Sequence, residues 1–130
     1  MSSVNKVIIV GNLGKDPEMR FTPQGQAVTS FSVATSRKFK QGDEWKSETT
    51  WFRVSVWGNA AESANKNLKK GSRVLVEGRL SPDKETGAPR VYESNGKYGA
   101  SYDVTADVVR FLNDKTEVAK NETVEDELPY

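Results

Sequence analysis

Five short segments of the chain carry the residue pattern of β-strands. Residues 6–10 form a β-branched run, and four further segments alternate apolar with polar side chains, namely residues 27–35, 49–58, 72–80 and 101–112. Because successive side chains of a strand point to opposite faces, alternation predicts strands with one face on a core and the other in water. We therefore expect an all-β protein built from five strands.

The third of these segments has the strictest alternation. The side chains expected to face the core are Phe52, Val54 and Val56. The side chains expected on the opposite face are Trp51, Arg53, Ser55 and Trp57. The two indoles are separated by six positions, a distance of about 20 Å along a strand. Two large aromatic side chains are thus expected on the face opposite the core, which Phe52, Val54 and Val56 already fill.

The last two segments predict further core positions. In residues 72–80 the expected buried side chains are Val74, Val76 and Leu80, with charged residues on the opposite face. In residues 101–112 the alternating set is Tyr102, Val104, Ala106 and Val108. Strict alternation through both segments would place each set on a single face.

Four connections carry turn or loop signals: residues 11–14, 16–25, 36–48 and 81–101. The third is polar and charged around Gly42 and Asp43, which predicts a hairpin loop. The fourth is rich in Gly and Pro and predicts a protruding hairpin around residues 90–92. Residues 11–16 resemble a phosphate-binding loop only superficially, because the spacing is short, Asp16 stands where Ser or Thr is needed and no helix follows.

One short helix is predicted between the third and fourth strands. Ala61, Ala64 and Leu68 recur at helical spacing. Asn59 is the expected N-cap, with Glu62 in the capping-box position, and Gly71 is expected to end the helix. Three strands, a lone helix and two strands are the order of the OB-fold, a Greek-key barrel whose working face binds oligonucleotides or oligosaccharides. The sequence therefore predicts a five-stranded OB-fold domain over residues 1–112.

Charge is distributed unevenly along the 130 residues. Residues 1–112 contain 17 basic and 12 acidic side chains, whereas residues 113–130 contain 2 basic and 6 acidic ones. The body thus has a formal charge of +5 and the tail −4, a pattern that favours an anionic partner for the body. Because alternation ends at residue 113 and hydrophobic residues become sparse, residues 113–130 are predicted to be a disordered acidic tail.

Composition removes several function classes. The chain has neither His nor Cys, which excludes His-based acid–base catalysis, Cys-His nucleophilic sites, disulfides and imidazole or thiolate metal sites. We expect no enzyme activity, no cofactor and no metal. No apolar run approaches a membrane span and no signal peptide is recognisable, so a cytoplasmic protein is expected.

The two tryptophans of the third strand suggest a platform for unpaired bases, because every base offers a π-face to an exposed aromatic ring. Arg53 lies between them and can bind phosphate or stack on a base. The alternative is that these indoles fill the core or a subunit interface, and alternation argues only against the core. Basic side chains near the aromatic residues favour the nucleic-acid interpretation; they are Lys6, Arg20, Arg37, Lys38, Arg73 and Arg79.

The chain ends in an acidic run with an apolar tip: Glu125, Asp126, Glu127, Leu128, Pro129 and Tyr130. Acidic tails usually serve only solubility. A tip with Leu and Tyr can instead dock in a pocket of a partner protein while the acids meet a basic rim. Both interpretations stay open on the residues alone.

Four stretches resemble bacterial single-stranded DNA-binding proteins: residues 4–20, 31–36, 50–54 and 70–78, within a similarity that spans residues 4–112 and returns at the C-terminal tip. The resemblance implies an OB-fold that assembles as a homotetramer, binds single-stranded DNA without sequence preference and performs no chemistry. It implies roles in replication, recombination and repair, with the acidic tip recruiting partner proteins, and a nucleoid-associated location.

Residue roles follow from the same resemblance. It implies stacking by Trp51, Trp57 and Phe39, where Phe39 replaces a more usual Trp, and phosphate contacts by Lys6, Arg20, Arg53 and Lys70. A further stacking aromatic of the family has no clean counterpart, and Tyr92 and Tyr98 are the nearest candidates. The tip carries Leu128 and Tyr130 where Ile and Phe are commoner.

Three rival functions remain at this point. One is RNA binding of the cold-shock type, which matched DNA and RNA titrations would distinguish. Another is an oligosaccharide module, for which salt would not weaken binding. The third is an oligomeric scaffold whose tryptophans form the subunit interface, so that their fluorescence would respond to dilution and not to DNA.

Overall fold

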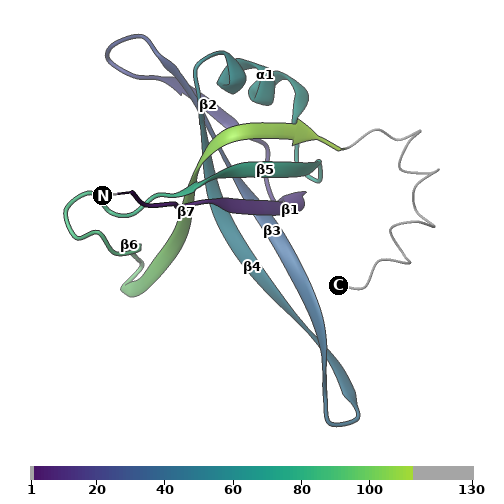
Figure 1. Ribbon diagram of the computed structural model, residues 1–130. Coiled ribbons are helices and arrows are strands. Elements are labelled where there is room, and N and C mark those ends of the chain that lie inside the picture. Colours follow the sequence, from purple (N-terminus) through teal and green to yellow (C-terminus); the bar gives the residue numbers. More distant parts are fainter. Residues whose placement is uncertain (1, 113–130) are drawn as a thin grey trace.

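The computed structural model describes residues 2–112 (Figure 1). The elements in chain order are β1 (Val7–Leu13), β2 (Glu18–Phe21), β3 (Ala27–Gln41), β4 (Glu44–Trp57), α1 (Asn59–Asn67), β5 (Arg73–Leu80), β6 (Arg90–Ser94) and β7 (Lys97–Phe111). The predictions for the tail at residues 113–130, including its tip Glu125–Tyr130, lie outside the described residues.

Five of the strands close into a barrel. Their order is β1-β5-β7-β4-β3, and a further pairing between β1 and β3 closes the ring. The β4–β7 pair is parallel and the others are antiparallel. The predicted five-stranded OB-fold is confirmed, with β2 added beside β3 and β6 beside β7.

The core consists of the inward-facing side chains of these strands. The fully buried members are Val33, Val54, Val56, Val74 and Val76, together with Val104. Phe52 and Ala106 pack against this cluster from its rim. The expected core face of residues 49–58 is therefore the observed one.

The helix closes one end of the barrel (Figure 1), where Ala61 and Ala64 are buried. The buried Thr29 hydroxyl of β3 donates a hydrogen bond to the Ala61 carbonyl oxygen, with 2.6 Å between the oxygens. The predicted Asn59 cap is wrong, because the N-cap is Gly58, with φ of 74° and no side-chain cap bond.

The predicted end of the helix at Gly71 is also wrong. The last helical residue is Asn67, and Leu68 takes an extended conformation there. Leu68 is buried, so core packing ends the helix before the glycine signal is reached.

The predicted turn at residues 11–14 is wrong. β1 continues through Gly11 to the buried Leu13, and a Cβ atom on Gly11 would clash with the Ala34 carbonyl oxygen of β3. Gly11 thus permits the close approach of two strands at the barrel seam, and does not form a turn. The predicted loop at residues 16–25 likewise contains a strand, β2, which carries Arg20.

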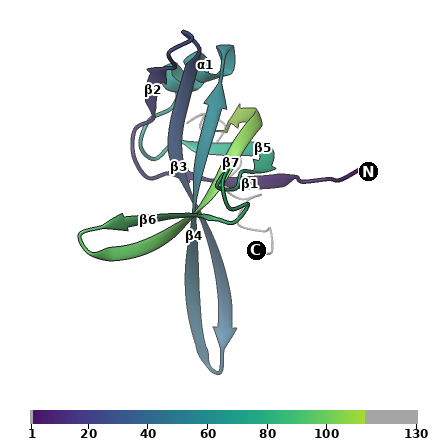
Figure 2. The same ribbon diagram turned by 90° about the vertical axis from the view of Figure 1, so that its left-hand side faces the viewer.

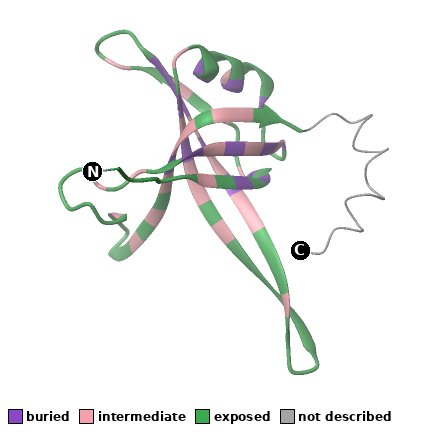
Figure 3. Cartoon of the chain, viewed as in Figure 1, coloured by how far each residue is buried: buried purple, intermediate pink, exposed green. Residues whose placement is uncertain are grey.

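Two hairpins extend beyond the barrel in different directions (Figure 2). The predicted hairpin at 36–48 is confirmed with its turn at Gly42 and Asp43, but its arms form a continuous ladder and not a loop, since Gln41 pairs with Glu44. The β6–β7 hairpin turns at Asn95 and Gly96, both with positive φ, as type I′ turns require. Most residues of both hairpins are exposed (Figure 3).

The predicted burial of Leu80 is wrong, because its side chain is 43% exposed. A register shift in the β5–β7 pair explains a second error: Glu77 pairs with Val108 but Gly78 pairs with Ala106, which leaves Asp107 as an extra residue. Such a bulge reverses which face the following residues occupy. Val109, and not Val108, therefore packs against the core.

Candidate nucleic-acid interface

The outer face of β4 presents two tryptophans to solvent. Trp51 is 52% and Trp57 44% exposed, and Arg53 and Ser55 between them are half-buried. The predicted separation of faces is confirmed, and neither indole belongs to the core of the barrel. Here "outer face" denotes the solvent side of β4 and of the residues on neighbouring strands that lie in register with it.

Trp51 lies against the backbone of Gly14, just beyond β1. A Cβ atom on Gly14 would come within 2.6 Å of ring atom Cζ3 of Trp51. The Gly14 amide in turn donates to the Ser32 carbonyl oxygen of β3 at 3.1 Å. Gly14, whose amide is bonded to β3, therefore packs against one side of the Trp51 indole and leaves about half of Trp51 exposed.

Strand register brings one arginine into the same row as Trp51. Trp51 pairs with Ala34 of β3, Ala34 with Asn12 of β1, and Asn12 with Arg73 of β5. Asn12 also accepts a hydrogen bond from the Arg73 guanidinium at 3.2 Å. Because partners in a row point to the same side of a sheet, the barrel seam places Arg73 and Trp51 on one continuous surface.

A second row places another arginine beside Trp57. Trp57 pairs with Val28 of β3, and Val28 pairs with Arg20 of β2. Val28 lies on the outer face but is only 6% exposed. An aromatic and a guanidinium thus flank one aliphatic side chain.

Two shallow depressions collect further cations. One, of about 230 Å³, is lined by residues that include Arg53 and Lys15. The other, of about 580 Å³, is lined by residues that include Trp57, Arg79 and Lys84. Lys15 and Lys84 were not among the predicted residues, and they could have been found only from their neighbours in space.

Lys70 is linked through its backbone to a residue that lines the first depression. Its backbone amide donates to the Asp16 carboxylate at 2.8 Å, and Asp16 also lines that depression. Lys6 is at the far end of β1, where the adjacent Asn5 exchanges two hydrogen bonds with the backbone of Leu80.

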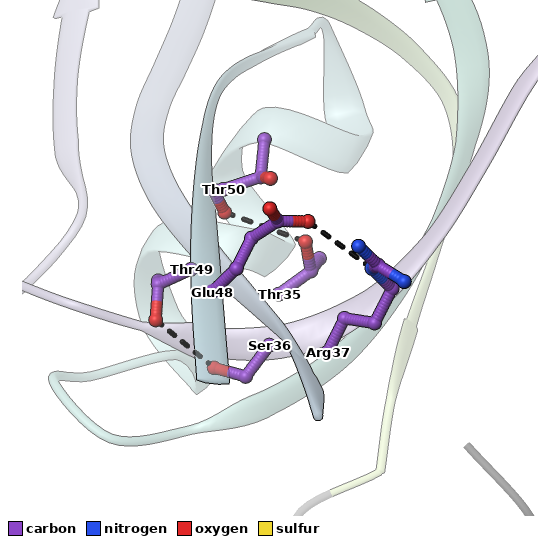
Figure 4. Close-up of polar contacts among 6 residues, drawn as sticks. All are labelled: Thr35, Ser36, Arg37, Glu48, Thr49 and Thr50. Carbon is purple, nitrogen blue, oxygen red and sulfur yellow. Dashed lines mark hydrogen bonds and ion pairs between the residues drawn. The ribbon is translucent and has the colours of Figure 1, made fainter. Parts of the chain in front are cut away.

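The opposite face of the β3–β4 hairpin carries Phe39. Phe39 pairs with Lys46 and continues the side of the strands that faces the core within the barrel. The Arg37 guanidinium lies 5.0 Å from the Phe39 ring centroid and 3.1 Å from a Glu48 carboxylate oxygen. Figure 4 shows this ion pair and the neighbouring contacts of Ser36 with Thr49. The structure therefore separates Phe39 and Arg37 from the tryptophans, whereas Lys38 lies on the outer face.

The β6–β7 hairpin separates its two tyrosines in the same way. Tyr92 pairs with Gly99 and its ring covers that glycine, since a Cβ there would approach ring atom Cζ to 2.6 Å. The Arg90 guanidinium lies 5.5 Å from the Tyr92 centroid. By alternation Tyr92 continues the outer face, while Tyr98, 78% exposed, lies on the other side.

One aromatic residue of the outer face, Trp45, was not among the predicted stacking residues. Trp45 lies on β4 six positions before Trp51, and the same spacing that relates Trp51 to Trp57 could have identified it. It was overlooked because residues 36–48 were interpreted as a loop, in which alternation has no meaning.

Within residues 2–112, no group of three or more acidic side chains is arranged to hold a metal ion. No helix in that part of the chain has both the length and the apolar character needed to cross a membrane. The arrangement offers stacking surfaces and cations, which are the groups that bind nucleic acid.

Comparisons with known proteins point the same way. A family model described as "Single-strand binding protein family" matches residues 4–112. A solved complex of a Plasmodium falciparum SSB with single-stranded DNA is similar at a TM-score of 0.69 and 28% identity, covering 87% of this chain and 98% of that one. A deletion mutant of the single-stranded DNA binding protein from Thermus aquaticus is similar at a TM-score of 0.67 and 28% identity, covering 86% of this chain and 52% of that one.

Proposed function

The chain belongs to the single-strand binding protein family, and on that premise we propose that it binds single-stranded DNA without sequence preference along the outer face of β4. The observation that carries the proposal is the exposed pair Trp51 and Trp57 on the outer face of β4, with Arg53 between them. The family is one of binding proteins without enzymatic activity.

Stacking supplies the preference for unpaired DNA. Each base that stacks on an aromatic side chain contributes about 1–3 kcal/mol, whatever its identity. Bases in a duplex have no free faces, so the same platform discriminates against paired DNA. Trp51 rests on Gly14 and is held in place before DNA arrives, which reduces the entropy that binding must remove.

Cations beside the tryptophans bind the phosphates. Arg73 and Arg20 lie in the rows of Trp51 and Trp57, and Arg79 borders the Trp57 depression. We assign Arg53, Lys38, Lys70 and Lys6 to the same role. Because phosphate contacts release counterions, affinity should fall as salt rises.

Phe39, Arg37 and Tyr98 lie on the opposite faces of the two hairpins. We assign Phe39 and Tyr98 to stacking, and Arg37 to phosphate, in a part of the DNA path that passes round the hairpins. Tyr92 extends the outer face along the β6–β7 hairpin, and we assign it to stacking as well.

Assembly as a homotetramer is the second part of the proposal. β1 pairs with β3 only through Asn12 and Leu13, so its edge over residues 7–11 is open for pairing with another chain. Beside this edge lies an aliphatic patch made of Ile8, Val10, Leu75 and Val108. Ile8 (58%) and Val10 (38%) are exposed, whereas Leu75 and Val108 are half-buried. Glu77 of β5 lies in register between Ile8 and Val108. An open edge next to an apolar patch is suited to a second copy of the chain.

The tail completes the proposal. We assign the tip Glu125–Tyr130 to recruitment of replication, recombination and repair proteins in the nucleoid of the cytoplasm. Its charge of −4 can also compete with DNA for the basic body, and salt should weaken that competition.

The test is tryptophan fluorescence during titration with oligo-dT at low and high salt. Saturable quenching that salt weakens and duplex competitor does not abolish supports the proposal. No quenching, with emission that responds to protein dilution, would favour a scaffold. Equal affinity for a matched RNA oligomer would favour the RNA-binding alternative, and binding that salt leaves unchanged would favour an oligosaccharide module.

A further inference from the structure

The three tryptophans of the chain form one regular series along β4. Trp45, Trp51 and Trp57 follow at intervals of six positions, an even number, so alternation places all three on the outer face. Trp45 is the most exposed of them, at 71%. We propose that Trp45 is a third base-stacking position, which extends the single-stranded DNA path to the tip of the β3–β4 hairpin.

The position of Trp45 is defined by a continuous ladder. Every residue of β3 from Arg37 to Gln41 pairs with a residue of β4, and the turn contains only Gly42 and Asp43. The Arg37–Glu48 ion pair and the Ser36–Thr49 contact brace the base of the hairpin on its two faces (Figure 4). The platform from Trp57 to Trp45 is thus about 40 Å long, twice the length of the Trp51–Trp57 pair alone.

The surroundings of Trp45 are suited to a polyanion. A shallow depression of about 510 Å³ is lined by Trp45, Lys38, Lys46 and Ser47. Lys40 is the register partner of Trp45 and Lys38 that of Ser47, so both lysines share the outer face with the indole. Among residues 2–112, none of these three lysines takes part in an ion pair.

Charge complementarity selects the occupant. An aromatic ring with Lys38 and Lys40 on the same face matches a base attached to phosphates, which combines stacking with charge neutralisation. A second copy of this chain that packed against Trp45 would have to place acidic side chains beside these lysines, because cations there would repel them. DNA provides the required negative charge with every phosphate. The inference rests on the proposed function and specifies how far the DNA path extends.

The first test uses Trp45 as its own reporter. The chain has three tryptophans, so the double variant Trp51→Phe with Trp57→Phe keeps aromatic platforms but leaves Trp45 the sole indole. Its emission is followed during titration with oligo-dT, while the anisotropy of a labelled oligo-dT reports binding independently. Saturable quenching that parallels the anisotropy change is expected. Full binding with unchanged Trp45 emission would overturn the inference.

The second test compares oligomer lengths. Trp45→Ala should weaken binding of long oligo-dT by about 5- to 150-fold and leave the affinity for oligomers that span only Trp51 and Trp57 unchanged. Gln41→Ala, at the same tip but on the opposite face, is the matched control and should change neither. An equal loss at all lengths, or none, would contradict the inference.

Measurements without DNA, and on the unmodified protein, distinguish failure of this inference from failure of the proposed function. If Trp45→Ala alters the oligomeric state measured by light scattering without DNA, Trp45 packs against another copy and the inference fails. If the unmodified protein itself does not bind oligo-dT, the proposed function fails. Binding by the unmodified protein with no contribution from Trp45 overturns only this inference.

Discussion

The barrel exposes apolar side chains on two parts of its outer surface, and the two differ in kind. The outer face of β4 carries flat indoles with arginines in register, whereas β1, β5 and β7 together carry the aliphatic patch Ile8, Val10, Leu75 and Val108. Indoles offer π-faces to bases and cations offer charge to phosphates. Aliphatic side chains offer neither, and bury best against other aliphatic side chains. Exposure alone therefore does not assign a partner, but the chemistry of the exposed groups does.

Their surroundings sharpen this comparison. Trp51 lies against Gly14, and its row of register partners continues across the barrel seam to Arg73. The aliphatic patch lies beside a strand edge that is open over residues 7–11. One surface is arranged around side chains and the other around unpaired backbone groups, which are what a second β-strand needs.

The largest expected effect is on assembly. Val10→Asp places a carboxylate in the aliphatic patch, and burying an unpaired charge costs several kcal/mol. Light scattering should therefore show a smaller species than for the unmodified chain at the same concentration, for which we propose a tetramer. Trp51→Glu is the matched control and should leave the mass unchanged. A Val10→Asp protein with unaltered mass would show that this patch is not an interface.

An intermediate effect is expected on DNA affinity. Trp51→Ala removes one stacking platform and should weaken oligo-dT binding by about 1–3 kcal/mol, with no change in assembled mass. Phe21→Ala is a suitable control, because Phe21 is 62% exposed and its register partner Ala27 is buried, away from the outer face. Isothermal titration of all three proteins measures the difference. Equal losses for both variants would contradict a specific role for Trp51.

The smallest effect is expected from the support beneath Trp51. Gly14→Ala brings a Cβ within 2.6 Å of the Trp51 ring, so the indole must move although it keeps its chemistry. We expect a loss of about 1 kcal/mol or less in oligo-dT affinity, below that of Trp51→Ala. The melting temperature serves as the control for folding. An affinity equal to that of the unmodified protein would mean that the position of the ring is unimportant.

Local physics made much of the fold predictable. Alternation in residues 49–58 assigned the faces of β4 correctly, because a strand within the barrel has one side on a core and one in water. The same rule was not applied to residues 36–48, where the hairpin leaves the barrel and neither face packs on a core. It failed after Asp107, where a bulge changes the face without any sign in the residue pattern.

The sequence by itself determined the five barrel strands, the lone helix between the third and fourth, and the exposed Trp51–Arg53–Trp57 face, since each depends on residues close together in the chain. Only the tertiary structure decided which cations join that face. Arg73 reaches the row of Trp51 through the β1–β3 seam, and Arg20 reaches Trp57 through β2. It also placed Phe39 on the opposite side of the hairpin from Trp45 and Trp51. These relations depend on strand register and barrel closure, which pair residues far apart in the chain and leave no periodic signal within any one segment.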